Sequence, residues 1–201
     1  QRSLSNPGDW NRSDWPRLWL YNLHYFDDLS AHDAPARTHW HQPLIARWIA
    51  ENPPAHGVGW EPYPTSLRIV NWIKWTLAGH VLDASARHSL AIQARWLRRR
   101  LERHLLGNHL WANAKALVFA GAYFDGDEAR RWRDQGMRLL RRQLAEQILL
   151  DGGHFERSPM YHAIVLEDLL DLLQLAQLYP QRIAADEVAR LRETATRMLR
   201  W

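Results

Sequence analysis

The sequence has 201 residues, no cysteine and 46% hydrophobic residues, which is enough apolar material to bury a core of domain size. The missing cysteines exclude disulfides and thiolate chemistry, and no apolar run approaches the roughly 18 to 20 residues of a membrane helix. Lysine and arginine outnumber the acidic residues by 26 to 22, and this excess favours an anionic partner, namely nucleic acid, a lipid surface or an acidic polysaccharide.

Neither end of the sequence has the pattern of a natural terminus. The first residue is not methionine, and the helical pattern of residues 184–201 still continues at the final residue. We therefore expect a segment of a longer protein, so that a missing signal sequence leaves the compartment open. We also expect residues 1–201 to form a single helical domain.

Helical periodicity begins after an N-terminal segment, residues 1–38, that we expect to be irregular. Trp40, Leu44 and Trp48 are spaced four residues apart, which predicts a first short helix. Residues 51–65 contain four prolines and two glycines, a composition that predicts a loop.

Two further helices are expected in the middle of the chain. Ser66 is the predicted N-cap of the first of these helices. In the second, an apolar stripe runs from Leu90 to Leu105, and Gly107 is the expected C-terminal cap. The opposite face of that helix, residues 95–104, is rich in arginine but interrupted by an acid, so we expect a solvated surface rather than a phosphate-binding one.

The last third of the chain repeats the same alternation of helix and turn. Helices are predicted at residues 110–124, around residues 137–148 and at residues 160–178, with a turn at 125–127 and a long loop at 151–159. No segment has the alternating pattern of a strand. The predicted fold class is therefore all-α.

Short connections between successive helices predict antiparallel helical hairpins. This zigzag places the loops 51–65, 107–109 and 150–159 at one end and the turns at 79–84 and 125–127 at the other. Helix N-termini, with free N–H groups and the positive end of the helix dipole, point to the first end. Such a face suits a ligand that carries carboxylates.

The first of these loops carries two candidate aromatic residues. The whole chain contains twelve tryptophans. Trp60 and Tyr63 are candidates for stacking against a sugar ring, and Arg68 for holding an acidic group. The alternative is a proline-rich loop held by buried aromatic residues, with Arg68 paired to an acid such as Glu61. We expect most of the tryptophans to fill the core.

The other two loops carry most of the remaining polar candidates. Asn108 and His109 lie at the start of a helix, with Asn113 one turn further along, although asparagine is also an ordinary N-cap residue. The third loop and the helix start after it combine acids, bases and charge stabilisers within nine residues, which are His154, Glu156, Arg157, Tyr161 and His162. The alternative is a plain helix start with Tyr161 as a core aromatic.

The sequence contains no HExxH motif, no glycine-rich phosphate loop and no GxSxG motif. We therefore expect neither a catalytic metal nor a cofactor.

Four segments of the sequence are informative as a set, namely LYNLHYFDDL (20–29), GWEPYPTSLRIVNWIKW (59–75), GNHLWANAKALVFAGAYF (107–124) and DGGHFERSPMYH (151–162). Together they resemble the N-terminal helical domain of heparinase II/III-type polysaccharide lyases. The resemblance covers most of the chain, from about residue 19 to residue 180. It implies an incomplete (α/α) toroid, normally followed by a β-sandwich domain, that cleaves uronic-acid-containing polysaccharides by β-elimination. The partners it implies are an anionic polysaccharide and the β-sandwich domain, not nucleic acid, and it favours a periplasmic or secreted protein.

The resemblance also implies roles for particular residues. Removal of the C5 proton of a uronate builds negative charge on the carboxylate, and Asn108, helped by His109, matches the family position that neutralises this charge. Tyr161 matches the family's tyrosine, which serves as acid and for some substrates as base. As a base it would need positive charge nearby, for which Arg157, His154 and Arg68 are candidates.

The same resemblance implies that a further catalytic histidine comes from the β-sandwich domain. The segment alone should therefore bind acidic oligosaccharide weakly and turn over slowly or not at all. The remaining candidates are expected to bind substrate, namely Trp60, Tyr63, Arg68, Asn113, His154, Glu156, Arg157 and His162.

Two other functions stay open at this point. A non-catalytic module for binding acidic polysaccharide or for scaffolding would have the same fold. A hydrolase on a similar toroid ranks below both, because hydrolases usually need two opposed carboxylates and only Glu156 beside Glu61 is a candidate pair.

Overall fold

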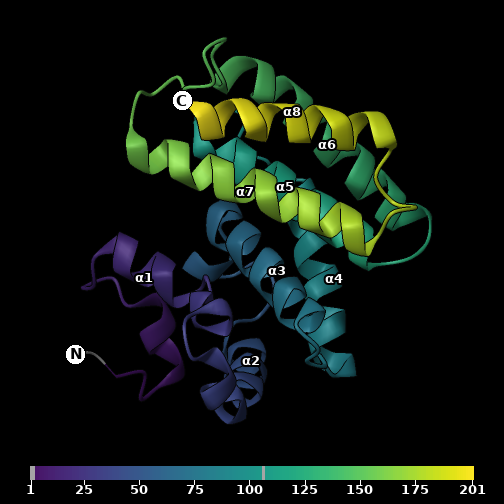
Figure 1. The fold of residues 1–201 in the computed structure, drawn as a ribbon. Coiled ribbons are helices and arrows are strands. Elements are labelled where there is room, and N and C mark those ends of the chain that lie inside the picture. The colour runs from purple at the N-terminus through teal and green to yellow at the C-terminus, as the bar shows by residue number, and fades with distance from the viewer. Residues whose placement is uncertain (1–2, 106) are drawn as a thin grey trace. The chain divides into compact units, whose positions relative to one another are not determined.

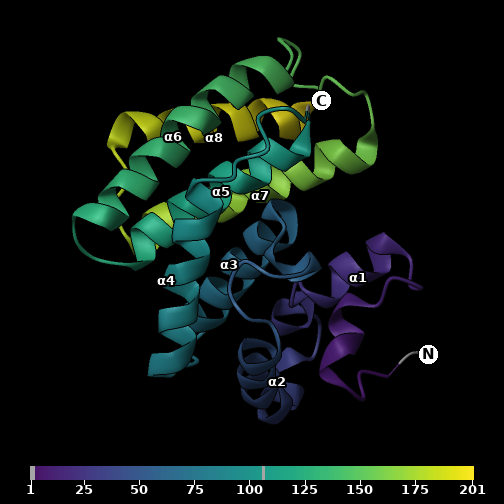
Figure 2. The same ribbon diagram turned by 180° about the vertical axis from the view of Figure 1, so that it is seen from behind.

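The structure is a computed structural model that describes residues 3–105 and 107–201. The chain divides into two compact units, residues 1–101 (unit 1) and residues 102–201 (unit 2), and each unit is described by itself. Both are helical (Figures 1 and 2). Within the described residues, β pairing is limited to one isolated bridge between Ile148 and His154, so the predicted all-α class is confirmed. None of the described helices is long and apolar enough to span a bilayer.

From residue 3 to residue 101, unit 1 forms four α-helices and four short 3-10 helices. The α-helices are α1 (Arg17–Leu23), α2 (Thr38–Glu51), α3 (Pro62–Leu77) and α4 (Ala84–Arg98). The 3-10 helices are Pro7–Asn11, Asp27–Ser30, Ala34–Arg37 and Val58–Trp60. Helix α4 packs against both α2 and α3.

The N-terminal part of unit 1 is more regular than its sequence pattern predicts. Residues 1 and 2 lie outside the described part, but α1 and three of the 3-10 helices fall within residues 3–38. The predicted stripe of α2 is also displaced by one residue at its start. Trp40 is 61% exposed, whereas His41, Ile45 and Trp48 are buried.

Two helix boundaries differ from the prediction. Helix α3 begins at Pro62 rather than Ser66, because the first positions of a helix have no intrahelical acceptor for their N–H groups and therefore tolerate proline. Helix α4 ends at Arg98, well before Leu105. Gly107 is not its C-terminal cap but the residue that precedes α5, with a φ of +80°.

The core of unit 1 is built largely from aromatic rings around His24. The indole N–H of Trp48 donates to His24 Nδ1 over 2.9 Å, and His24 Nε2 lies 3.1 Å from the Trp10 carbonyl oxygen. Since the indole only donates and the carbonyl only accepts, His24 is neutral with its proton on Nε2. Burial, reinforced by the nearby charge of Arg68, lowers the pKa of His24 to about 3.

This neutral histidine makes the stability of the chain dependent on pH. In the unfolded state His24 binds a proton near pH 6.5, whereas in the folded state it does so only near pH 3. The contribution of the neutral His24 to the free energy of unfolding is therefore complete above pH 6.5 and is lost as the pH falls. Between these limits we expect the free energy of unfolding to fall by about 1.4 kcal/mol per pH unit from this group. When urea unfolding is measured from pH 7 to pH 4, the free energy of unfolding of His24→Gln should fall less steeply with pH than that of the unaltered chain. Equal slopes in the two proteins would contradict the assignment.

The described residues of unit 2 form four α-helices, which lie in two neighbouring pairs (Figures 1 and 2). They are α5 (Asn108–Tyr123), α6 (Asp127–Gln147), α7 (Pro159–Leu178) and α8 (Ala185–Arg200). Helix α5 packs on both α6 and α7, and α7 packs on α8. Two glycines let α5 and α6 approach closely, because a Cβ at Gly136 would lie 2.7 Å from the Ala114 carbonyl oxygen and one at Gly121 would lie 2.5 Å from Arg133.

An ion cluster joins α5 to α7 inside unit 2. Lys115 Nζ lies 2.5 Å from an oxygen of Asp168 and 2.6 Å from an oxygen of Asp171, and the indole N–H of Trp111 donates to Asp168 over 2.8 Å. Burial by itself lowers the pKa of Lys115, but the two carboxylates more than offset it, so that this pKa is raised. The side chain of Lys115 is only 7% exposed. The lysine is therefore a charged link within the core.

Replacing Lys115 tests the importance of this link. We expect Lys115→Met to lower the free energy of unfolding by about 3–5 kcal/mol, because two largely buried carboxylates lose their partner. The only other lysine of the sequence, Lys74, provides the matched control, and Lys74→Met should change the free energy by about 1 kcal/mol or less. Similar losses in the two variants, measured by chemical denaturation, would exclude a special role for Lys115.

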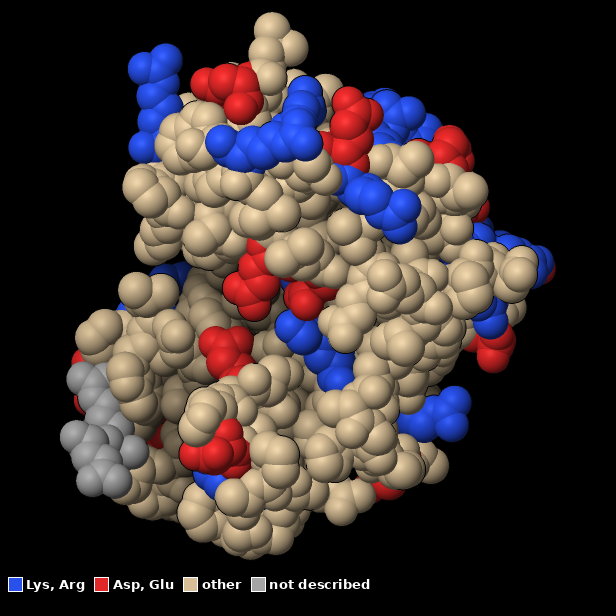
Figure 3. Space-filling view, viewed as in Figure 1, with Lys and Arg blue, Asp and Glu red and all other residues tan. Residues whose placement is uncertain are grey.

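Charged side chains of both signs are mixed over the surface of unit 2. Figure 3 shows blue and red side chains interspersed over its helices on the face in view. Several arginines have acidic partners, which include the pairs Arg130–Asp127, Arg141–Glu187 and Arg182–Asp125. Unit 2 has 14 basic and 14 acidic residues, so the excess of 4 basic residues in the sequence comes from unit 1 (12 basic, 8 acidic).

Candidate functional site

The start of α5 carries the first two candidate residues. Gly107 is buried and has a φ of +80°, and Asn108 and His109 occupy the first turn of the helix. Both side chains are half-buried, and that of His109 is 31% exposed. This position combines the positive end of the helix dipole with polar side chains, which suits the binding of a carboxylate.

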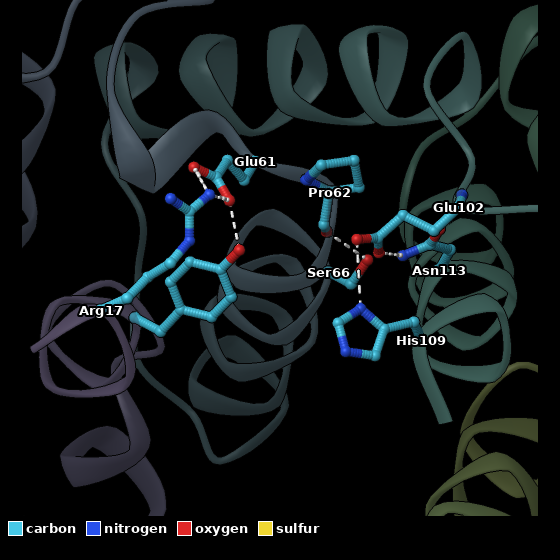
Figure 4. Close-up of polar contacts among 8 residues, drawn as sticks. Arg17, Glu61, Pro62, Ser66, Glu102, His109 and Asn113 are labelled. Atoms are coloured by element: carbon cyan, nitrogen blue, oxygen red, sulfur yellow. Dashed lines mark hydrogen bonds and ion pairs between the residues drawn. The ribbon is translucent and has the colours of Figure 1, made fainter. Parts of the chain in front are cut away.

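Glu102 contacts both this turn and the next one (Figure 4). One carboxylate oxygen of Glu102 is 3.1 Å from His109 Nδ1, and the other accepts a hydrogen bond of 3.2 Å from the amide nitrogen of Asn113. In return, the backbone N–H of Glu102 donates to the Asn113 amide oxygen over 2.9 Å. Glu102 and Asn113, both buried, therefore hold each other through reciprocal hydrogen bonds, and Glu102 in turn holds the imidazole of His109 in place.

The partner of His109 also fixes its proton. A glutamate carboxylate only accepts hydrogen bonds at neutral pH, so the imidazole nitrogen that faces it, Nδ1, carries the hydrogen. In the neutral ring this leaves Nε2 as the basic nitrogen. Glu102 is not among the residues predicted from the sequence, because its position in the arginine-rich pattern of residues 95–104 predicts a solvated helix face. No local pattern marks it, since its partners depend on where the chain turns after Arg98.

The third loop lies against the start of α5 within unit 2. The amide nitrogen of Gln147 donates to the Gly107 carbonyl oxygen over 2.9 Å, and a Cβ on Gly107 would come within 2.6 Å of a carboxylate oxygen of Glu156. The predicted meeting of residues 107–109 with residues 150–159 is thus confirmed. Arg157, exposed in this loop, has a left-handed backbone with a φ of 54°.

Tyr161 lies in the first turn of α7, half-buried, with its ring centroid 6.3 Å from that of His154. Among the described residues, none forms a hydrogen bond with its hydroxyl group. The neighbouring His162 turns towards α8, where its Nε2 lies 3.1 Å from the Met198 carbonyl oxygen and its ring stacks on Trp201. Tyr161 and His162 therefore face different surroundings although they are adjacent in sequence.

His154 is buried, with only 1% of its surface exposed. Burial is the main cause that lowers its pKa, so that the ring is neutral at neutral pH and does not supply positive charge to Tyr161. Asn113 is completely buried as well. Neither residue is placed to touch a polysaccharide directly, and both hold other residues of the cluster instead.

The candidates in unit 1 form a separate set. Trp60 is 3% exposed, its indole N–H donates to the Asn52 carbonyl oxygen over 3.1 Å, and its ring packs against Trp48. Tyr63 is half-buried and lies edge-on to Tyr25. The tryptophan is thus a core residue, and the tyrosine retains accessible surface.

Arg68 is completely buried in unit 1. Its guanidinium group lies 3.9 Å from the ring centroid of Trp48 and donates to Gln93 over 2.9 Å and to the His24 carbonyl oxygen over 3.2 Å. It does not pair with Glu61. Its surroundings therefore assign it to the core.

Glu61 instead binds two residues of α1 (Figure 4). It accepts hydrogen bonds from Arg17, at 2.6 Å to each carboxylate oxygen, and from the hydroxyl group of Tyr21. Burial, together with the Glu61 carboxylate, raises the pKa of Tyr21. The predicted position of residues 51–65 at the same end as the loops 107–109 and 150–159 stays a prediction.

The orientation of His109 can be checked by its tautomer. In the 201-residue chain, at a pH where the ring is neutral, 15N NMR should report hydrogen on Nδ1 of His109. We expect Glu102→Leu to shift the ring towards the Nε2–H form, because the acceptor beside Nδ1 is gone. Glu167→Leu, on an exposed position of α7, is the control and should leave the tautomer unchanged. An Nε2–H ring in the unaltered chain would rule out the assignment.

Comparison with known proteins gives consistent matches. The family model of the heparinase II/III N-terminus matches residues 41–199. A heparin-sulfate lyase of Bacteroides stercoris is 38% identical over 74 residues, which are 36% of this chain and 11% of the relative. A heparin-sulfate lyase of Bacteroides thetaiotaomicron is 33% identical over 72 residues, 35% of this chain and 10% of the relative. These alignments thus span about a tenth of each relative's length.

Solved structures match over almost the whole chain. A heparinase III gene product has a TM-score of 0.69 at 18% identity, covering 99% of this chain and 36% of that one. The heparan sulfate lyase of Pedobacter heparinus, in a mutant form, has a TM-score of 0.65 at 20% identity, covering 94% of this chain and 32% of that one. These likenesses establish the fold, and they agree with the predicted all-α toroid class. Because the family model covers most of its length, the chain belongs to the heparinase II/III N-terminal family.

Proposed function

We propose that this chain is the N-terminal domain of a polysaccharide lyase that cleaves a uronic-acid-containing, glycosaminoglycan-like polysaccharide by β-elimination. The observation that carries the proposal is the first turn of α5, where Asn108 and His109 lie half-buried at the helix N-terminus. There Glu102 orients His109 through the contact between its carboxylate and His109 Nδ1. The names of the relatives, heparin-sulfate lyase and heparinase III, support this substrate class.

In the proposed reaction the uronate carboxylate binds at the start of α5. Removal of the C5 proton moves negative charge onto that carboxylate, and fixed donors stabilise the charge best when they are oriented beforehand. The Asn108 amide and the positive end of the helix supply such donors. His109, whose orientation is set by Glu102, assists them.

Tyr161 is the proposed acid, which protonates the leaving oxygen on C4 of the sugar. A tyrosine hydroxyl group can donate a proton in this way as a general acid. For a role as base, the exposed Arg157 is the remaining source of positive charge among the three named from the sequence, since His154 is neutral and Arg68 is buried in unit 1. The C5 proton passes to a base, which is either Tyr161 itself or a further catalytic histidine expected from a β-sandwich domain, so that the chain alone contributes half of the site.

The burial of the other candidate residues supports their division into substrate-binding residues and structural residues. Tyr63, Glu156 and Arg157 have accessible surface and remain proposed substrate-binding residues. The others have internal partners that account for their positions, and we assign them to support of the fold and of the catalytic residues. These are Trp60, Arg68, Asn113, His154 and His162.

The decisive variant is Tyr161→Phe in a longer chain that continues into the proposed β-sandwich domain. We expect the formation of unsaturated uronate product to fall by a factor of about 10² to 10⁴, because proton transfer is lost, while oligosaccharide binding persists. The measurement is product absorbance together with calorimetric binding.

Tyr123→Phe, at the other end of α5, is the control and should retain activity. Full product formation by Tyr161→Phe would remove Tyr161 from the mechanism. If the unaltered longer chain bound heparan-type oligosaccharides but formed no product, the non-catalytic binding module would be the better explanation.

A further inference from the structure

Gln147, the last residue of α6, connects three segments of unit 2 through one buried side chain. Its amide nitrogen donates to the Gly107 carbonyl oxygen over 2.9 Å and to the Gln143 amide oxygen over 2.6 Å. Its amide oxygen lies 3.1 Å from His154 Nε2. Gln147 has no exposed surface, so both N–H groups and the oxygen of this amide are used inside the protein.

The chemistry of the two ends fixes the direction of every hydrogen bond in this chain of contacts. A carbonyl oxygen only accepts, so the atom of Gln147 beside Gly107 must be its nitrogen. Its oxygen then faces His154, whose Nε2 must carry hydrogen. At the far end, the backbone N–H of Glu156 lies 3.4 Å from His154 Nδ1, and because an N–H only donates, Nδ1 carries none. His154 is therefore held as a single neutral tautomer.

The backbone of the loop reinforces the same connection. The N–H of Phe155 donates to the Gln147 carbonyl oxygen over 2.8 Å, and the N–H of Arg157 donates to the His154 carbonyl oxygen over 2.9 Å. The ring of Tyr161 then lies against that of His154. The contacts thus lead without a break from the residue before Asn108 to the tyrosine at the start of α7.

From this arrangement we infer that Gln147 and His154 form a positioning bridge that sets Asn108 and His109 relative to Tyr161. Neither residue is proposed to touch substrate. The bridge itself is a property of the 201-residue chain, whereas its effect on turnover rests on the proposed function.

The bridge can be tested without any assay of activity. In the 201-residue chain, 15N NMR should report the Nε2–H tautomer for His154. Gln147→Met keeps the shape of the side chain but removes its hydrogen bonds, and should abolish this tautomer preference and shift the amide resonances of His109 and Tyr161. Gln143→Met is the matched control, because it removes only one acceptor of the Gln147 amide and leaves the contacts of Gln147 to Gly107 and His154. Equal changes in both variants, or an Nδ1–H ring in the unaltered chain, would overturn the bridge.

The kinetic test uses a longer chain that includes the proposed β-sandwich domain. We expect Gln147→Met to lower kcat by about tenfold or more through misplacement of the reacting groups, with KM nearly unchanged and the protein fully folded by circular dichroism. His154→Leu should behave alike. His154→Gln should recover most of the activity, because its amide nitrogen can donate to Gln147 as Nε2 does.

The two tests separate the possible failures. A folded Gln147→Met enzyme with unaltered kcat would overturn the positioning role even if the tautomer result stands, and so would a loss that only follows the unfolded fraction. If the longer chain shows no lyase activity at all, the proposed function fails, while the NMR measurement still decides whether the bridge exists.

Discussion

Asn113 lies inside α5 without exposed surface, and its amide holds Glu102 twice, once through the backbone and once through the carboxylate. An amide buried without partners would cost about 1–3 kcal/mol for each unsatisfied group. After α4 ends at Arg98, the chain turns and brings Glu102 to Asn113 of α5. This also brings a carboxylate to His109, so that the same interaction that satisfies the core also orients a proposed catalytic side chain.

The other buried polar groups of α5 also have specific hydrogen-bond or ion-pair partners. Helix α5 is buried from Trp111 to Ala122, yet this stretch includes an asparagine, a lysine and the indole N–H of a tryptophan. Each of them meets a specific partner, and the partners come from the preceding loop or from α7. Buried polar groups thus specify which elements lie beside α5 more narrowly than its apolar surface could, since apolar packing has no preferred direction.

Unit 1 uses tryptophan in a comparable way. An indole adds a hydrogen-bond donor to a large apolar ring, and the chain places such donors against buried acceptors, as with Trp48 and His24 or Trp60 and the Asn52 carbonyl oxygen. The abundance of tryptophan therefore reflects in part the polar atoms that the core must satisfy, whereas the buried indole N–H groups of Trp72 and Trp75 have no hydrogen-bond partner in the described part of the chain. Arg68, stacked on Trp48, belongs to this core.

The sequence by itself determined the all-α class, the succession of hairpins and the positions of Asn108, His109 and Tyr161 at helix starts. These features follow from helical periodicity and from breaker residues, which act over a few neighbours along the chain. Only the tertiary structure decided which polar side chains are buried and what they bind. Glu102 looked like a surface residue, and Gln147 had no distinguishing pattern, although it contacts a carbonyl group 40 residues away. Trp60, Arg68 and His154 looked available to a ligand and turned out to be internal. The partner of a buried polar group is set by the packing of distant segments, and a local pattern does not contain that information.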